Sequence, residues 1–360
     1  MCQASSHRDA LATRNGVEQP AEVTTGGALG VEPDGAGGVV IRALELWLDP
    51  PGARPSAFVS HAHASGGLES TRVLCSPETL RLAAAGGSAS DARVIAWDGS
   101  VEMAVGAAFG GGTARLSIAP AGHLLGAAQL VVDHPRGRFV YTGDWSGWAD
   151  ASHPAGAVVA CDELAVTATF ALPIFRFPPP ETALGALVAW CREELQSNAT
   201  PIVLAQTPGG AQAVLLSLVE QGIPVAARDD VLRACAAYEA PGRSFAAVRA
   251  LAEGDGGAAV VASSRTKRSD LHVKGRMAVA YASGWSLLDA MVDQRRADAA
   301  FPLADHADSD ALVSLALATG ARLVHAIYGD ARALADLLRR RGLEAVRAHD
   351  APGIDERSGA

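Results

Sequence analysis

The chain has 360 residues, 49% of them hydrophobic and 19% charged, which is a globular composition long enough for two or three domains. Its formal net charge of −9 gives no support to nucleic-acid binding over the whole surface, so any such contact requires a local basic patch. The five cysteines include no Cys-x-x-Cys pair, which disfavours a disulfide framework and favours a reducing cytoplasm. No apolar run approaches the length of a membrane span.

The first half of the chain is predicted to be rich in strands. Residues 1–27 lack an apolar leader and are expected to form a disordered tail. Short apolar or alternating runs then follow one another, cut by Pro and Gly, up to about residue 170. Among them, residues 128–146 are predicted to form a hairpin, and residues 76–87 a single helix with Ser76 as its N-cap.

The pattern changes after residue 181, where strands and helices alternate. Residues 181–285 are therefore predicted to form a parallel α/β block. Its Gly-rich turn "TPGGAQ" could cradle a phosphate, although such turns more often serve tight strand-to-helix packing. A helix, a strand, a helix and a strand are expected between residues 305 and 348. The strand-rich start and this end could be two parts of one domain split by the block.

Several candidate metal ligands follow apolar runs, as side chains do at strand ends. They are His61 and His63 in "SHAH", His123 in "PAGHLLG", Asp144 in "YTGDWS" and His306 in "LADHAD". Neutral imidazoles and a carboxylate are a normal ligand set for Zn²⁺. Taken singly, each histidine is more often an ordinary hydrogen-bonded residue, so the prediction depends on their order and context.

That order resembles a known family. Asp49 is followed by "SHAHASG", "PAGHLLGAAQ", "YTGDWS", "TATFALPIFRFP", "LADHAD" and "YG". This succession is similar to the metallo-β-lactamase-fold nucleases with a β-CASP-type insertion, in particular the ligase-associated DNA exonucleases and mRNA 3′-end processing factors. The resemblance covers roughly residues 40 to 348, and "PAGHLLGAAQ" and "TATFALPIFRFP" are its most specific motifs.

The resemblance implies the fold and its division along the chain. We expect an α/β (α+β) protein, a metallo-β-lactamase αβ/βα four-layer sandwich with an inserted α/β cap. Residues 28–180 and 286–350 would form the sandwich, and residues 181–285 the β-CASP-like cap. Residues 351–360 would be a tail.

The resemblance also implies two metal sites, of which one is retained. The ligands of the first metal correspond to His61, His63, His123 and Asp144, and all four are present. The unique ligands of the second metal correspond to Ser65, Gly66 and Tyr328, none of which is a family ligand. The losses therefore remove one site and spare the other.

Three further positions take their expected roles from the family. Asp49 would support the site, and His306 would donate a proton near the leaving group. Thr167 replaces the acidic residue of the family's "EATF" motif.

We therefore expect a catalytically disabled family member with one zinc ion, acting in DNA repair or RNA processing. It would bind nucleic acid or a protein of those pathways. One alternative is an active mononuclear-zinc phosphodiesterase, with His306 as acid and Asp144 as ligand or base. Another is a structural subunit that binds no nucleic acid.

Basic residues gather in one part of the chain, where nucleic acid could bind. They are Arg265, Lys267, Arg268, Lys274 and Arg276, with Arg295 and Arg296 further on. A solvated loop in an arginine-rich protein explains them equally well.

Overall fold

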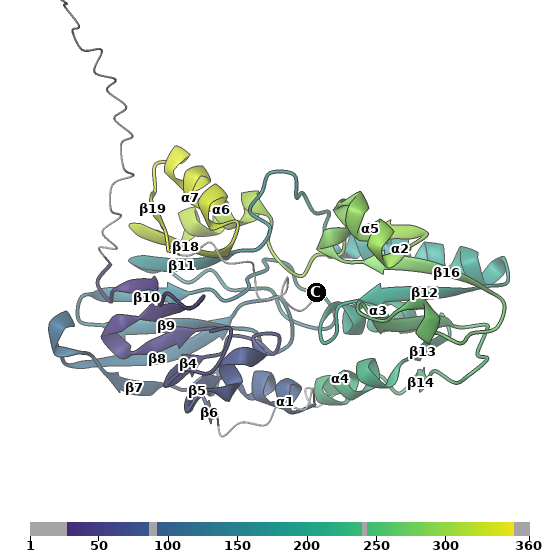
Figure 1. Ribbon diagram of the computed structural model, residues 1–360, viewed down its shortest axis with the longest axis horizontal. Coiled ribbons are helices and arrows are strands. Elements are labelled where there is room, and N and C mark those ends of the chain that lie inside the picture. Colours follow the sequence, from purple (N-terminus) through teal and green to yellow (C-terminus); the bar gives the residue numbers. More distant parts are fainter. Residues whose placement is uncertain (1–26, 86–91, 240–242, 349–360) are drawn as a thin grey trace, which may run out of the picture.

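The computed structural model describes residues 27–85, 92–239 and 243–348, which form three β-sheets and seven α-helices in an elongated molecule (Figure 1). Of the predicted tail over residues 1–27, residues 1–26 lie outside the described residues, as does the predicted tail over residues 351–360. The helices are α1 (Pro77–Ala85), α2 (Pro180–Gln196), α3 (Gly210–Glu220), α4 (Asp229–Glu239), α5 (Asp289–Arg295), α6 (Ser309–Thr319) and α7 (Ala331–Arg340).

The first sheet contains six strands in chain order, antiparallel from β1 to β3 and parallel from β3 to β6. Its strands are β1 (Val31–Pro33), β2 (Val39–Ile41), β3 (Leu46–Leu48), β4 (Ser56–Phe58), β5 (Arg72–Cys75) and β6 (Arg93–Val94). Because β3 and β4 are parallel neighbours, the residues that follow them meet at one edge of the sheet.

The second sheet has the order β19-β18-β11-β10-β9-β8-β7. Strands β7 to β10 form an antiparallel meander, which includes the predicted hairpin, and β10, β11, β18 and β19 are parallel. The strands are β7 (Val101–Ala104), β8 (Thr113–Pro120), β9 (Ala128–His134), β10 (Gly137–Tyr141), β11 (Glu163–Ala168), β18 (Leu323–Gly329) and β19 (Glu344–Arg347).

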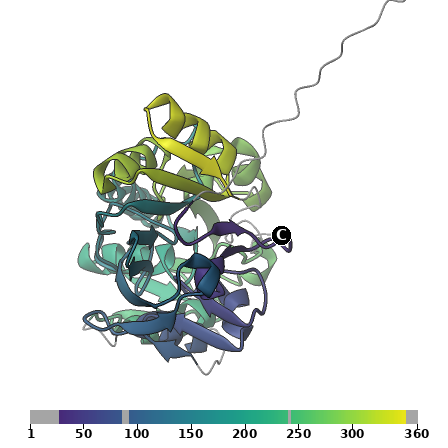
Figure 2. The same ribbon diagram turned by 90° about the vertical axis from the view of Figure 1, so that its left-hand side faces the viewer.

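These two sheets pack face to face between two helical layers (Figures 1 and 2). Leu48 and Phe58 of the first sheet share a buried core with Leu130 and Phe139 of the second. Helix α1, whose Ser76 hydroxyl accepts the Thr79 N–H at 3.1 Å, covers the outside of the first sheet. Helices α6 and α7 cover the outside of the second. The predicted αβ/βα sandwich is confirmed.

The third sheet is parallel throughout, with the order β14-β13-β15-β12-β16-β17. Its central strand β12 is buried at all seven residues, as is typical of a parallel sheet covered on both faces. The strands are β12 (Ala199–Ala205), β13 (Val225–Ala227), β14 (Val248–Ala250), β15 (Ala259–Ser263), β16 (Arg276–Ala282) and β17 (Ala299–Phe301).

The third sheet is an insertion in the sandwich. Strands β11 and β18 pair directly, although α2, the third sheet and α5 lie between them in the chain. Because β17 belongs to the third sheet, the inserted elements run to Phe301 and do not end at residue 285. We call them the cap, residues 180–301. The cap core is continuous with Leu124 and Leu125 of the sandwich, which places the two lobes in direct contact.

Candidate metal centre

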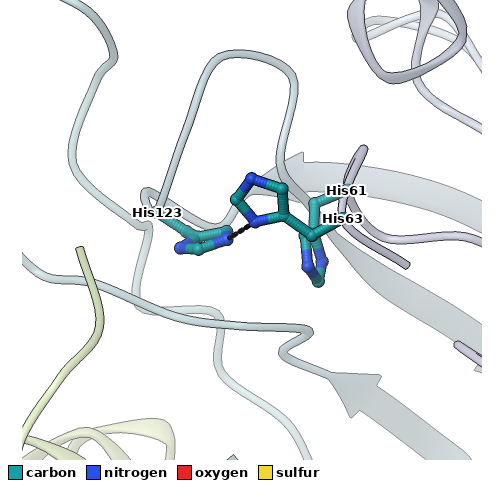
Figure 3. A group of neighbouring side chains, drawn as sticks. All are labelled: His61, His63 and His123. Atoms are coloured by element: carbon teal, nitrogen blue, oxygen red, sulfur yellow. Dashed lines mark hydrogen bonds between the residues drawn. The ribbon is translucent and has the colours of Figure 1, made fainter. Parts of the chain in front are cut away.

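Three histidines from two separate loops converge where the sandwich meets the cap (Figure 3). His61 and His63 follow β4, and His123 follows β8. Their nearest ring nitrogens all lie within 4.8 Å of one another. A second group with the same spacing joins His123 to Asp144, which follows β10, and to His306. Within the described residues, these His and Asp side chains, all buried except the partly buried His63, could hold a metal ion.

The hydrogen bonds around His61 determine which of its nitrogens faces the centre. The Ser60 hydroxyl donates to the buried Asp49 carboxylate, which can only accept. Because its own proton points to Asp49, the Ser60 hydroxyl accepts a hydrogen bond from His61 Nδ1 at 2.8 Å. The lone pair of the His61 ring therefore lies on Nε2. That atom is buried, has no hydrogen-bond partner among the described residues, and lies 3.3 Å from Asp144 Oδ2.

His63 and His123 are oriented in the same way by carbonyl groups. His63 Nε2 is 2.9 Å from the Pro208 carbonyl oxygen, and His123 Nδ1 is 3.2 Å from the Asp305 carbonyl oxygen. Because a carbonyl oxygen only accepts, these nitrogens carry the protons and the lone pairs lie on His63 Nδ1 and His123 Nε2. These two atoms face each other at 3.2 Å (Figure 3), where two lone pairs repel unless a cation lies between them.

The distances fit a tetrahedral ion. With metal–ligand bonds of about 2.0–2.1 Å, neighbouring ligand atoms of a tetrahedral zinc site lie about 3.3–3.4 Å apart. The His63–His123 and His61–Asp144 separations of 3.2 and 3.3 Å are two such edges. Each imidazole also has an outer hydrogen-bond partner, as metal-binding histidines usually do. The donor set and its geometry therefore fit Zn²⁺.

The backbone around the centre adopts costly conformations. Asp49 and His123 have positive φ angles of 42° and 56°. A left-handed conformation costs a non-glycine residue about 1–2 kcal/mol, and such strain gathers at functional sites. Gly122, with φ of 81°, could not carry a side chain, because a Cβ there would overlap the carbonyl oxygen of Ser146.

His123 and His306 have opposite pKa shifts and therefore different protonation states. Burial and the neighbouring His306 lower the pKa of His123 to about 3, so this imidazole is neutral, as a ligand must be. Burial also opposes the charge of His306, but Asp305 and Asp144 raise its pKa well above the usual value. Its Nδ1 lies 2.7 Å from Asp305 Oδ1 and its Nε2 lies 3.2 Å from Asp144 Oδ2. His306 therefore holds a proton at the edge of the centre.

The three positions expected to have lost the second metal offer no ligand. Tyr328 is buried in the core between the two sheets and donates its hydroxyl to the Leu48 carbonyl oxygen at 2.6 Å. Ser65 is exposed on the short helix that follows the histidines. A side chain at Gly66 is blocked, because its Cβ would overlap the Pro51 carbonyl oxygen. Backbone from the end of β3 thus occupies the space beside two of the three positions.

Thr167, the position of the missing acid, is buried on β11. Its hydroxyl has no hydrogen-bond partner among the described residues.

A cavity of about 890 Å³ opens beside His63, between the sandwich and the cap. We call it the arginine cleft, because Arg228, Arg233, Arg265 and Arg295 line it. Two carboxylates, Asp230 and Asp270, line it as well, which leaves an excess of two positive charges in a chain of net charge −9.

The basic residues expected to bind nucleic acid are distributed unevenly around this cleft. Arg265 and Arg295 line it, whereas Lys267, Arg268, Lys274 and Arg276 are not among its lining residues. Arg268 pairs with Asp298 at 3.7 Å, and Arg276 pairs with Glu194.

Sequence reasoning did not single out Ser60, Arg228 or Arg233. Only the serine carried a signal, because it directly precedes the first histidine at a strand end. The two arginines lie at the start of and within α4, where charges are usually solvated.

Comparison with known proteins finds a distant relative. It is 28% identical over 312 residues to a protein of Opitutus terrae named probable DNA ligase. The similar region covers 86% of this chain but only 30% of the relative, so the chain spans less than a third of the protein that it matches. No family model matches the chain.

Proposed function

We propose that this chain is a nucleic-acid-binding accessory protein of DNA repair. It belongs to the metallo-β-lactamase nucleases with a β-CASP-type insertion and keeps only one of their two metal sites. The observation that carries the proposal is the contrast between the two sites. His61, His63 and His123 aim three lone pairs at one point beside Asp144, while the Tyr328 hydroxyl is bonded to backbone instead.

His61, His63, His123 and Asp144 would hold one zinc ion. A bound zinc ion supplies a Lewis acid and lowers the pKa of a water molecule to about 7. Two metal ions about 3.5–4 Å apart are needed to stabilise both the attacking and the leaving oxygen in phosphodiester cleavage. In our proposal this chain holds only one of these ions. We therefore expect binding of nucleic acid with little or no cleavage.

The relative named probable DNA ligase supports DNA over RNA as the nucleic acid. In that protein the similar region is part of one long chain. We propose that the present chain acts beside a DNA ligase.

Metal content and DNA binding test the proposal together. The purified protein is expected to contain about one zinc per chain and to lose it in His61→Ala and in His123→Ala. A matched control is His134→Ala, because His134 lies at the end of β9 and in neither candidate metal group. The protein should also bind single-stranded DNA with an affinity that falls steeply with salt. A protein that binds no zinc, or two, contradicts the single-site assignment.

A mononuclear phosphodiesterase is the second candidate, and His306 is the observation that favours it. Its proton, held between Asp305 and Asp144, is placed as a general acid would be. Metal-dependent cleavage of DNA, abolished by both His306→Ala and His123→Ala, would establish this activity in place of the accessory role. If the protein neither cleaves nor binds DNA, the remaining interpretation is a structural subunit.

A further inference from the structure

Two cavities meet next to the candidate metal centre, and two residues line both of them. The arginine cleft of about 890 Å³ adjoins a small cavity of about 30 Å³, lined by His123, Asp305 and His306. Gln206 and Trp285 are common to the two. A volume of about 30 Å³ holds roughly one water molecule. A polymer lying in the cleft can therefore reach Trp285, but it has no room to continue into the small cavity.

Trp285 is held firmly by other aromatic rings. Its ring centroid lies 4.6 Å from that of Phe170 and 5.5 Å from that of Phe175, with the Phe175 ring nearly perpendicular to it. Phe170 in turn lies 5.6 Å from the His306 ring. Gly284 permits this packing, because a Cβ there would lie 2.8 Å from the Phe170 ring. The indole is thus a partly exposed, fixed surface tied to the centre.

The cleft beside Trp285 suits a chain of phosphates. Within the part of the chain that the structure describes, Arg233 and Arg265 form no ion pair, so both guanidinium groups can meet an anion. Proteins that hold single strands combine such a basic groove with aromatic rings on which bases stack. Bases inside a duplex are already stacked on each other and do not offer a free face to a side chain.

We propose that Trp285 is a stacking platform for the terminal base of a single strand whose phosphates lie along the arginine cleft. The inference rests on the proposed function and deepens it, because it names the ligand as a single strand with a free end. The aromatic packing positions that base beside His306, and the small cavity beyond it, with room for about one water molecule, makes it the last base on the side of the metal centre.

Binding of an oligo(dT) labelled at one end, measured by fluorescence anisotropy, tests the platform. Replacing an aromatic residue that stacks on a base by alanine lowers affinity about 5- to 150-fold. We expect that loss for Trp285→Ala and much less for Trp285→Phe, which keeps a ring. Trp97→Ala is the matched control, because Trp97 is 39% exposed and lines neither of these cavities.

Oligonucleotides with an abasic site at the 5′ or the 3′ terminus test the same contact without changing the protein. One of the two abasic oligonucleotides should bind the wild-type protein as weakly as the intact strand binds Trp285→Ala. The Trp285→Ala variant should bind that abasic oligonucleotide and the intact strand with equal affinity.

Full affinity of Trp285→Ala, or of both abasic strands for the wild type, would overturn the platform. If Arg233→Ala and Arg265→Ala still weakened binding, the proposed DNA-binding function would stand without it. Absence of any binding by the wild type would overturn both.

Discussion

Ser60→Ala is expected to weaken zinc binding without touching a ligand atom. The Ser60 hydroxyl links the buried Asp49 carboxylate to His61 Nδ1. Without it, His61 is free to carry its proton on either nitrogen, and the buried carboxylate loses a donor. Loss of an outer partner of a metal ligand costs about 10- to 100-fold in metal affinity. The unpaired buried groups should also lower the free energy of unfolding by about 1–3 kcal/mol.

Tyr141→Phe separates these two effects. The Tyr141 hydroxyl donates to the same Asp49 oxygen at 2.6 Å and, within the described residues, forms no hydrogen bond with His61. It should therefore lower stability by a similar amount and leave zinc affinity within a few-fold of wild type. Competition with a chromophoric chelator measures the affinity, and urea unfolding of the metal-free proteins measures the stability. Equal zinc affinity of Ser60→Ala and wild type, or equal losses in the two variants, would refute the relay through Ser60.

Three further substitutions test other parts of the structure. Gly66→Ala should lower the unfolding free energy by about 1–3 kcal/mol in urea titrations, because its Cβ meets the Pro51 backbone; an unchanged midpoint would contradict this packing. Gly122→Ala should cost about 2–4 kcal/mol, since a positive φ adds to the overlap, and a stable variant would show that the loop relaxes. Burial opposes ionisation of Asp34, but backbone N–H groups and Arg54 lower its pKa to about 2. Its contribution is therefore present above pH 4 and lost as the pH falls towards 2, so Asp34→Asn should lower the melting temperature at pH 6 but not at pH 2.

Much of the fold could be predicted from the sequence, because its signals are local. Strand β12 ends in an apolar run over residues 202–205, and the hairpin of β9 and β10 is marked by its turn. The candidate ligands were found for a related reason. Each candidate ligand follows a strand. A short sequence motif therefore identifies both the residue type and its position after a strand.

The cleft could not be predicted in the same way, because it depends on contacts between distant segments. Arg265 faces the cleft while Arg276, in the same basic stretch, is paired with Glu194 of α2. Nothing in the local sequence distinguishes these two arginines. Arg233 reaches the cleft only because α4 packs beside α1, where Arg81 Nε donates to the Ala237 carbonyl oxygen at 3.1 Å.

The pairing of β11 with β18 has a consequence for the order in which the protein folds during synthesis. β11 is buried at every residue in the finished protein and pairs with β10 on one edge, yet β18, its partner on the other edge, is made only after the whole cap. Until then β11 presents an open edge of backbone N–H and C=O groups, the kind of edge that recruits strands from other chains. The cap has a parallel sheet of its own and can fold first, whereas the sandwich can complete its second sheet only after β18 and α7 have been synthesised. The nascent chain should therefore depend on chaperones between these two stages.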